Sequence, residues 1–566
     1  MLRDSIQPER LVRWLLIPAV LAATSASAQQ LPGIGDVLRG VEKTRPQAPP
    51  QTRPKVDVNQ PARPALKGTD TLRFRVDRIR LTGVTSLPEA DLVRLLRPYV
   101  GRDLTLRDLN EAAAEITHLY RERGYPVARA YVPAQEVRDG VVEITVLEGR
   151  YGKVSVEVDA PFSRDMADEA VQPLRPNAVI EERALDRSLL LLDDLGGIAA
   201  RGTLKPGERP GTADLVVDVT ETERYGGAVS VDNYGNDVTG RNRLGGSLHA
   251  DNLAGRGDTL AARAIVAERS DLVYGQIAYN LPLTGNGLQA GAIGTYTNYT
   301  LGEALSALGA TGYAGIATAY LRYALIRSRR GSLYTQLVFD AKNLEDKIGS
   351  AGTFDPRRES VLTLTLFGDA PDPGPTGGIT SGSLSVVGGR LNIEDATALA
   401  IDQATRQSEG GFFKLNYSLV RLQNLTRGLQ LYAAVSGQLA SRNLDPVEQF
   451  SLGGPLGVRA YPTGEAPGDE GILGTLEARY ALPIPRFPGV MQAIAFLDSG
   501  SVKINKYPFA PLPNHRTLTG AGIGLNVFAR WGIQLSASYA WALGDEPATG
   551  DTGRSSEGWI QLIKTF

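Results

Sequence analysis

The residue types that most often carry catalysis or hold metals are scarce in this chain. It contains no cysteine, and its three histidines, His118, His249 and His515, lie far apart. No G-x-S-x-G elbow, H-E-x-x-H pair or G-x-x-x-x-G-K-[ST] loop occurs, and the glycine-rich stretch 374–378 lacks the Lys-Ser/Thr of a phosphate-binding loop. The sequence therefore predicts no catalytic residues, no metal site and no cofactor.

The carboxyl-terminal half carries a repeating pattern that predicts a β-barrel. More than three hundred residues of short alternating segments, rich in Gly and aromatics, end in the strand-like GWIQLIKTF. In a membrane barrel, lipid-facing and lumen-facing side chains alternate between recurring turns. Ile560, Leu562 and Phe566 share one parity, although Lys564 interrupts it, so an all-β soluble domain is the alternative.

Residues 1–28 are typical of a secretory signal. Three arginines precede an apolar stretch from Trp14 to Ala23, and Ala26-Ser27-Ala28 offers a cleavage site. The apolar stretch is too short, and too interrupted by Pro18, for a spanning helix, and no later segment resembles one. An exported chain of this kind enters a membrane only as a barrel, so we expect the outer membrane of a Gram-negative bacterium.

Composition excludes some partners. A chain with 42% hydrophobic residues, 22% charged residues and a net charge of −2 is typical neither of disorder nor of polyanion binding, so we expect no nucleic acid partner. The 63 glycines and 21 tyrosines, against 3 methionines, favour tight turns and interfacial aromatic rings. Without cysteine there are no disulfides and no thiolate metal ligands.

Residues 29–45 are predicted to form a short amphipathic helix, because Ile34, Val37, Leu38 and Val41 recur at helical spacing. Three glycines weaken this helix, so its stability has to come from docking. Residues 46–69 hold six prolines among polar and basic residues and are predicted to be an extended linker without a core. The arrangement is a helix on a tether, and a disordered tail is the equal alternative.

Two small α+β repeats are predicted before the barrel, at residues 70–150 and 151–222. In the first, strand residues around Ile79 precede two helices, and Thr105 with Asp108 opens the second helix. Two strands, Val127 to Pro133 and Val141 to Leu147, close the unit, and the same order recurs in the second repeat. Such sheets leave an edge that an extended chain can join as an added strand, or that charge merely blunts.

Four motifs in the first repeat resemble a known family in their order and spacing. They are similar to the first POTRA domain of two-partner secretion transporters, the hemolysin secretion/activation family. The resemblance implies an α+β periplasmic part with two POTRA domains, an N-terminal plug helix at 29–45, and a 16-stranded antiparallel transmembrane β-barrel of the outer-membrane assembly-factor superfamily. The motifs are Leu81-Thr82-Gly83, the LYRERGY segment from Leu119 to Tyr125, Val132-Pro133-Ala134-Gln135 and Leu147-Glu148-Gly149.

The barrel is expected to occupy residues 223–566, which leaves about 21 residues for each of sixteen strands with its connection. Tight turns are predicted at 251–258, 280–285 and 482–485. Longer polar connections are predicted at 369–382 and 443–471, facing outward or folding inward.

The connection 443–471 holds the most distinctive sequence of this half. Val458, Arg459, Ala460 and Tyr461 resemble the superfamily's V-R-G-aromatic tip of a loop that folds into the lumen. The family usually has Gly at position 460. If that position needs a positive φ, alanine would be strained there.

The arginine of this tip is expected to have a partner on the barrel wall. Alternation along residues 490–500 turns Asp498 toward the lumen. The resemblance pairs its F-x-D-x-G strand (Phe496, Asp498, Gly500) with the loop arginine and so implies an Arg459–Asp498 tether. The residues alone favour two separately solvated charges. If the tether forms, a reciprocal charge swap should restore secretion that either single swap abolishes.

The resemblance implies a pore for one extended client. The client would be a large adhesin or haemolysin-like exoprotein with an N-terminal secretion domain, captured by the POTRA domains and moved to the cell surface without nucleotide hydrolysis. The plug helix would occupy the pore at rest. Outer-membrane lipid, lipopolysaccharide and, during biogenesis, the barrel assembly machinery are the other expected partners. Which residues bind the client is not predicted.

Two other functional classes are alternatives. A factor that inserts β-barrel proteins into the outer membrane shares the barrel and the inward loop, but typically carries more POTRA repeats. A passive porin or nutrient receptor would explain neither periplasmic repeat.

Overall fold

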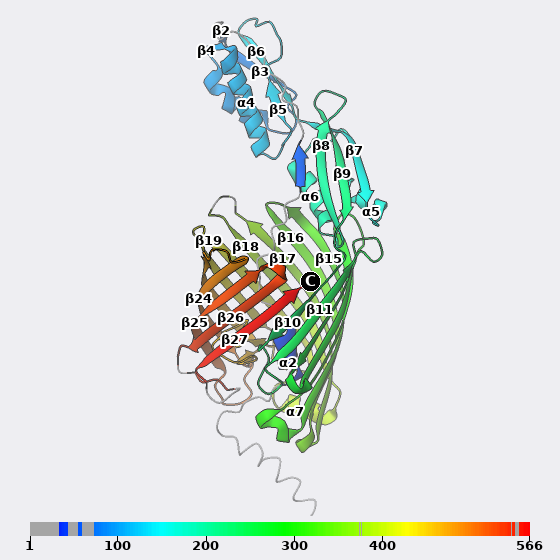
Figure 1. The fold of residues 1–566 in the computed structure, drawn as a ribbon, viewed down its shortest axis with the longest axis vertical. Coiled ribbons are helices and arrows are strands. Elements are labelled where there is room, and N and C mark those ends of the chain that lie inside the picture. Colours follow the sequence, from blue (N-terminus) through cyan, green and yellow to red (C-terminus); the bar gives the residue numbers. More distant parts are fainter. Residues whose placement is uncertain are drawn as a thin grey trace, which may run out of the picture.

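The computed structural model describes residues 33–42, 55–58, 73–372, 374, 376–544, 546–549 and 554–566. Two small domains stand on one end of a barrel, as Figure 1 shows. The expected signal at 1–28 lies outside the described residues, as does most of the linker. Within the described part of the chain, no helix has the length and apolar character needed to cross a membrane.

Sixteen antiparallel strands close into a barrel, which confirms the predicted fold class. The ring is closed by β10 (Tyr225–Asp232) and β27 (Ser556–Thr565), which pair antiparallel. The strands between them are β11 (Arg243–Asp251), β12 (Thr259–Ala267), β13 (Leu272–Pro282), β14 (Leu288–Thr300), β15 (Ala310–Ser328), β16 (Gly331–Ile348), β17 (Thr353–Pro371), β18 (Gly378–Ile393), β19 (Gly410–Asn424), β20 (Leu429–Ala440), β23 (Glu470–Leu482), β24 (Gly489–Lys503), β25 (His515–Ala529) and β26 (Ile533–Ala542).

Alternation along the strands separates a lipid face from a lumen face. In β27, Ile560 and Leu562 are 51% and 45% exposed on the outside, whereas Trp559 on the other parity is buried. A two-residue side-chain period on a closed sheet has this result, because successive side chains point to opposite faces.

One predicted connection is wrong. The sequence predicts a long polar connection at 369–382, but β17 runs to Pro371 and β18 begins at Gly378. The ladder pairs Asp369 with Ser381 and Pro371 with Ile379. Pro371 is tolerated because it ends its strand, where a missing N–H costs little. The two strands are joined by a short turn, which lies at the same end of the barrel as the small domains.

The other end of the barrel carries most of the remaining short helices. Helix α7 (Ala396–Ala404) lies between β18 and β19. Short 3-10 segments join other strand pairs at this end: η2 (Glu268–Ser270), η3 (Glu303–Leu308) and η4 (Gly349–Ala351). A further one, η6 (Arg530–Gly532), joins β25 and β26 at the end that carries the small domains.

The first small domain has the predicted helices against a short sheet. Its sheet pairs β3 (Arg78–Thr82) in parallel with β6 (Val141–Leu147), which also pairs with β5 (Arg129–Tyr131), a strand shorter than predicted. A separate ribbon pairs β2 (Arg73–Val76) with β4 (Arg102–Thr105). The helices are α3 (Glu89–Leu96), the 3-10 turn η1 (Arg97–Tyr99) and α4 (Leu106–Glu122). Helix α4 begins after Thr105 as predicted, and Thr105 and Asp108 form a capping box there.

The second small domain contains β7 (Arg150–Asp159), β8 (Ile198–Pro206), β9 (Thr212–Glu221), α5 (Arg164–Val171) and α6 (Glu182–Asp193). Its sheet has a fourth member, β1 (Lys55–Val58), which comes from the proline-rich linker and pairs in parallel with β8. The sequence predicts a linker without a core, but these four residues join a sheet. The linker is extended there, and its backbone pairs with the edge of the sheet at β8.

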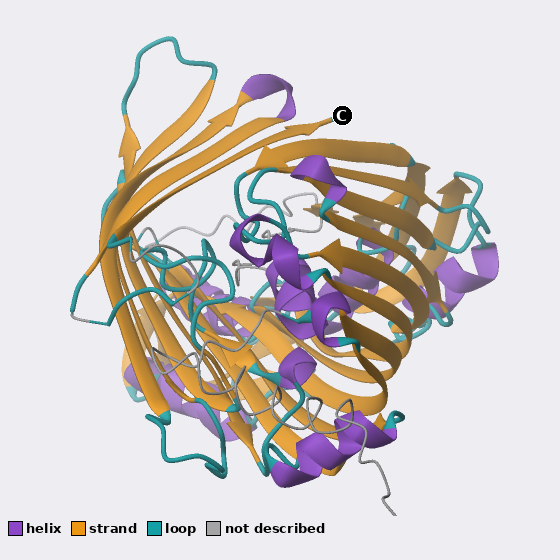
Figure 2. Ribbon diagram, turned by 90° about the horizontal axis from the view of Figure 1, so that it is seen from below, coloured by secondary structure: helices purple, strands orange, loops and turns teal. Residues whose placement is uncertain are grey.

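Helix α2 (Ile34–Glu42) lies within the ring of strands. Figure 2, seen from the end opposite the small domains, shows helices and loops inside the barrel. All four predicted apolar residues of the helix, Ile34, Val37, Leu38 and Val41, are buried. They pack against lumen-facing side chains that include Ile265, Leu272, Tyr274, Tyr299 and Leu344.

Candidate functional site

The connection between β20 and β23 folds into the lumen and fills part of it. It comprises residues 441–469, because Glu470 and Gly471 of the predicted 443–471 already belong to β23. Inside it, β21 (Phe450–Ser451) pairs with β22 (Pro467–Gly468), and the 3-10 turn η5 (Pro446–Glu448) precedes them. Gly454 adopts a φ of 107°, a conformation that favours glycine and lets the loop turn back on itself. We call residues 441–469 the inward loop.

Arg459, at the tip of the inward loop, is enclosed by the barrel wall and is only 3% exposed. Its Nε and Nη2 donate to Asp498 Oδ2 and Oδ1 at 2.7 and 2.8 Å, and its backbone N–H donates to the same carboxylate at 3.2 Å. The guanidinium carbon lies 3.3 Å from the centre of the Phe496 ring. The structure thus brings Arg459, Asp498 and Phe496 together, and the arginine is bound both bidentately and by a cation–π contact.

Three further residues around this arginine were not predicted from the sequence. Arg459 Nη1 donates to Glu477 Oε1 at 2.7 Å, and Thr475 Oγ1 donates to Asp498 Oδ1 at 3.0 Å. The indole Nε1 of Trp559 donates to the Arg459 carbonyl oxygen at 2.7 Å. The sequence did contain a signal for two of them, because strand alternation puts Glu477 and Trp559 on the lumen face. A carboxylate there needs a partner.

The other predicted loop residues lie in one buried cluster. Val458, Ala460 and Tyr461 are each 1% exposed or less, and the Tyr461 hydroxyl donates to the Glu546 carbonyl oxygen at 3.0 Å. On the wall, a Cβ added to Gly500 would come within 2.5 Å of the Leu452 side chain. The absence of a side chain at Gly500 therefore leaves room for the loop.

Ala460 is not strained. Its φ is not positive, unlike that of Ala466 in the same loop, where φ is 51°. The methyl group of Ala460 instead points at a strand glycine: a Cβ added to Gly520 would lie 2.5 Å from the Ala460 Cβ. Gly520 is the register partner of Asp498. The space that alanine needs at the tip is thus provided by the neighbouring strand.

Helix α2, which the sequence analysis predicts to be a plug, is anchored at its amino end by a carboxylate of the barrel wall. The Ile34 N–H donates to Asp346 Oδ1 at 3.0 Å, and the Tyr299 hydroxyl donates to the same oxygen at 2.6 Å. A helix amino end carries partial positive charge, so an acidic partner stabilises it there. A Cβ on Gly35 would come within 2.4 Å of the backbone of Pro446 and Val447. The helix therefore touches the inward loop directly.

A second connection between the helix anchor and the inward loop is ionic. Arg357 on β17 forms an ion pair with Asp346 and donates from Nη1 to Asp445 Oδ2 at 2.7 Å. Asp445 belongs to the inward loop, so the carboxylate that holds the plug helix is linked to the loop through one buried guanidinium.

A cluster of lysines and glutamates holds η5 of the inward loop. Lys342 pairs with Glu359 at 3.0 Å and with Glu448, and Lys414 pairs with Glu448 at 2.6 Å. Both lysines come from the wall, on β16 and β19. Two segments inside the lumen, α2 and the inward loop, are therefore held to the wall by polar contacts at several points.

The first small domain contains a carboxylate with an unusually full set of hydrogen bonds. Glu148, in the predicted Leu-Glu-Gly motif, is 5% exposed and accepts from the N–H groups of Thr85 and Ser86, both at 2.6 Å, and from both hydroxyls. The Tyr120 hydroxyl donates to it at 3.0 Å. Burial alone would raise the pKa of Glu148, but the hydrogen bonds from Thr85 and Ser86 hold it below its ordinary value.

The second small domain is docked on the barrel by ion pairs. Arg329, in the turn between β15 and β16, donates to Asp186 at 2.8 Å and to Glu182 at 2.7 Å, both on α6. Arg327 donates to Asp194 at 2.7 and 2.6 Å. Partly buried, multiply bonded pairs of this kind fix an orientation better than isolated surface pairs do.

Metal binding finds no support in the residues that the structure describes, which contain no group of three His, Asp or Glu side chains suited to an ion. His118 is exposed on α4 beside Glu122, and His249 lies 3.9 Å from Asp251.

Comparisons with known proteins agree with this architecture. A family model for the ShlB-type POTRA domain matches residues 74–149. A model for the haemolysin secretion/activation protein ShlB/FhaC/HecB matches residues 211–350 and 376–527, which is more than half of the chain. The second model thus covers most of the barrel, with its inward loop, and the end of the preceding small domain.

Relatives of known name are similar over most of their length. The heme/hemopexin transporter protein HuxB of Haemophilus influenzae is 28% identical over 480 residues, 84% of each chain. The outer membrane transporter CdiB of Dickeya dadantii is 24% identical over 507 residues, 86% of each chain. The solved structure of CdiB from Escherichia coli superposes over the whole of both chains with a TM-score of 0.70 at 20% identity, which shows a shared fold.

Proposed function

This chain belongs to the haemolysin secretion/activation protein family ShlB/FhaC/HecB, the two-partner secretion transporters of the outer membrane, and from that premise we propose how it moves its client. The periplasmic small domains capture one extended exoprotein, of the adhesin or haemolysin class, through its N-terminal secretion domain. The barrel then conducts that chain to the cell surface without nucleotide hydrolysis.

The observation that carries this proposal is that two segments occupy the lumen. They are a short amphipathic helix and a loop, and both are held to the wall by hydrogen bonds and ion pairs at Asp346, Arg357 and Asp498. Once the segment moves, these polar groups can form hydrogen bonds with water or with a polar client instead, so a segment held by them can leave without unfolding the wall. A barrel whose lumen is occupied by segments that can leave, α2 and the inward loop, suits conduction of an unfolded chain.

Capture requires main-chain recognition that tolerates many sequences. The sheet of each small domain ends in two edge strands, and an edge strand offers backbone amides and carbonyls through which an added strand can bind. Strand β1 supports this mode, because an extended segment of the chain itself already lies on β8. No nucleotide is required if the client folds after it emerges, since folding makes its return unfavourable.

The test is deletion of the gene followed by comparison of the proteins released into the medium and of the outer-membrane fraction. We expect one large released protein to be missing, and to return when the wild-type gene is restored. Broad loss of outer-membrane barrels, with no selective loss in the medium, would favour instead the factor that inserts β-barrel proteins.

A further inference from the structure

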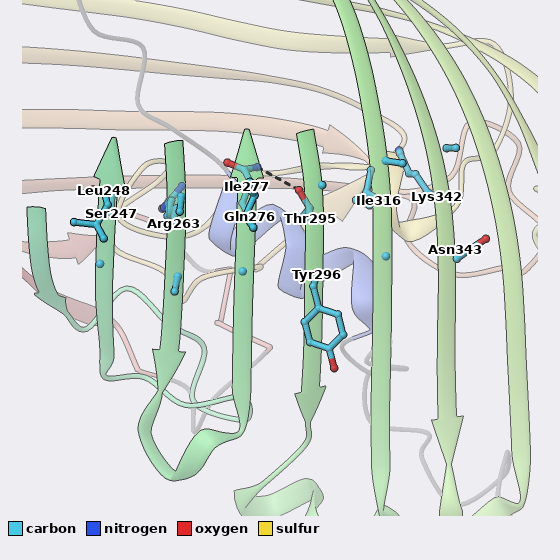
Figure 3. A pocket seen from close by; sticks show the side chains of 18 of the residues that line it. Ser247, Leu248, Arg263, Gln276, Ile277, Thr295, Tyr296, Ile316, Lys342 and Asn343 are labelled. Carbon is cyan, nitrogen blue, oxygen red and sulfur yellow. Dashed lines mark hydrogen bonds between the residues drawn. The ribbon is translucent and has the colours of Figure 1, made fainter. Parts of the chain in front are cut away.

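The lipid-facing wall carries a long apolar groove with a volume of about 1060 Å³. Its lining recurs as triplets of consecutive residues on neighbouring strands, such as 246–248 in β11, 275–277 in β13 and 294–296 in β14. Strand register sets these triplets side by side, with Gly246 opposite Ala264 and Ala264 opposite Gly275. The groove thus crosses the wall from β10 to β17, and Figure 3 shows part of it on consecutive strands.

The parity of the triplets shows that the groove faces lipid. In each triplet the central residue belongs to the lumen face and its two neighbours to the outer face. In β13, for example, Gln276 is central and the outer Ile277 is 63% exposed. The strand backbone therefore forms the floor of the groove, and rows of outward-pointing side chains form its two sides.

Missing side chains give the groove its depth. A Cβ built on Gly246, Gly275 or Gly294 would meet no atom within 4 Å. Larger side chains, Val229, Leu248, Ile277, Tyr296 and Phe566, stand around this open floor and are all substantially exposed. A glycine inside a strand often marks a place where a ligand or another chain approaches the backbone closely.

The groove climbs across the membrane. At one end it passes Val229, four residues after β10 begins on the side of the small domains. At the other end it reaches Arg358, five residues from the start of β17 on the opposite side. Seven strand spacings of about 4.8 Å give it a length of roughly 34 Å across the strands. Because barrel strands tilt by about 35–45°, the groove rises by roughly 20–24 Å, most of the hydrocarbon core of a bilayer at about 30 Å.

The end at β17, farthest from the small domains, is polar and carries a guanidinium. The Arg358 side chain is 68% exposed and its Nε lies 3.0 Å from Glu394 Oε1. Asn343, its register partner on β16, is exposed beside it. Below them, the rings of Tyr296 and Tyr313 meet edge to face at 5.5 Å, as aromatic residues do near a membrane interface. A guanidinium has five N–H donors, so the ion pair with Glu394 leaves capacity for an anion.

We propose that this groove binds lipopolysaccharide, with an acyl chain along the glycine floor and a phosphate against Arg358. The polar end lies on the extracellular side, so its phosphate comes from the outer leaflet, whose lipid is lipopolysaccharide. Within a bilayer an acyl chain gains no hydrophobic energy by entering an apolar groove. Affinity therefore comes from close packing on the glycine floor and from charge-assisted hydrogen bonds to the phosphate.

The experiment is native mass spectrometry of the full-length protein in detergent, titrated with lipopolysaccharide of the shortest sugar core. The wild type should retain one molecule. The double variant Gly275→Leu, Gly294→Leu, which fills open space on the outer face, should bind at least tenfold more weakly, and so should Arg358→Gln. Two matched controls should bind at least as tightly as the wild type: Ala319→Leu adds bulk to the same wall outside the groove, and Glu394→Gln removes a competing carboxylate but keeps the guanidinium.

Heat-modifiable migration on gels establishes that each variant has a folded barrel. Should the leucine variant fail to fold, Arg358→Gln with its Glu394→Gln control decides alone. The proposal is overturned if the folded leucine variant or Arg358→Gln retains lipopolysaccharide like the wild type. Equally tight retention of phosphatidylethanolamine would overturn the assignment to lipopolysaccharide. None of these readouts depends on secretion, so the proposed function can fail without affecting this inference.

Discussion

Arg459 of the inward loop and Asp498 of strand β24 lie 39 residues apart in the chain and form a buried bidentate pair with hydrogen bonds of 2.7 and 2.8 Å. Asp498 is completely buried and Arg459 nearly so. Glu477 contacts the same guanidinium and also pairs with Arg479 at 2.6 Å, so two cations and two carboxylates alternate in this cluster.

The second carboxylate changes the expected outcome of a charge swap. Arg459→Ala or Asp498→Ala leaves an unpaired buried charge, which costs roughly 3–5 kcal/mol, and should displace the loop and reduce secretion at least about tenfold. Arg459→Asp with Asp498→Arg should not restore secretion, because it places a new carboxylate against Glu477. Adding Glu477→Gln should restore it in part. Secretion assays on folded barrels measure this, and full rescue by the double swap alone would contradict the expectation.

Ala460 and Gly520 should behave as a size-matched pair. Gly520→Ala places two Cβ atoms within 2.5 Å and should destabilise the barrel by about 1–3 kcal/mol, the usual cost of overpacking. Combining it with Ala460→Gly removes the clash and should recover most of the loss. Urea unfolding of the four proteins gives the coupling energy. Gly474→Ala, whose Cβ would have an ordinary contact at 3.7 Å, is the control and should be nearly neutral.

Gly35→Ala should have opposite effects on the intrinsic stability of the plug helix and on its docking against the inward loop. Alanine favours helix by about 1 kcal/mol over glycine, so helix propensity alone predicts a better plug. The new methyl group would instead meet the backbone of Pro446 and Val447. We therefore expect a displaced helix and a higher ion conductance in planar bilayers, approaching that of a protein lacking residues 29–45.

Gly33→Ala is the matched control for the plug, because its Cβ would approach Asp346 only to 3.4 Å. Its conductance should equal that of the wild type. If the Gly35→Ala variant has the same ion conductance as the wild type, the contact between the helix and the inward loop is not tight.

Glu148 should make the first small domain sensitive to acid. Its folded-state pKa is lowered, so its stabilising contribution is complete above its ordinary pKa of about 4.3 and is lost as the pH falls through the folded value. Glu148→Gln should lose about 2–3 kcal/mol at pH 7 and show less further loss in acid. Pulse proteolysis in urea at pH 7 and pH 4 measures both effects. Glu136→Gln, at an exposed surface pair, should change neither.

Strand β1 should compete with the client for the sheet edge at β8. Replacing residues 55–58 with Gly-Ser-Gly-Ser should raise the affinity for the client's N-terminal secretion domain roughly five- to tenfold, because a tethered competitor is lost. Calorimetry on the full-length protein measures the change. The same replacement at residues 47–50 keeps the linker length and should have no effect. If both replacements leave the affinity unchanged, the client does not add a strand at β8.

Much of this protein was open to prediction because local periodicity reflects local geometry. A two-residue period turned Asp498 toward the lumen, helical spacing identified Ile34 and Leu38 as a buried face, and Thr105 with Asp108 marked a helix start. Each of these depends only on residues within one or two turns of one another.

Partners that come from distant strands were decided by the tertiary structure alone. The meeting of Asp346, Arg357 and Asp445, the pairing of β1 with β8, and the close approach of Gly35 to the inward loop follow from how the barrel closes and how its strands are staggered. Gly35 illustrates the difference. Read along the chain it weakens a helix, whereas in the folded lumen the absence of its side chain is what lets the helix dock.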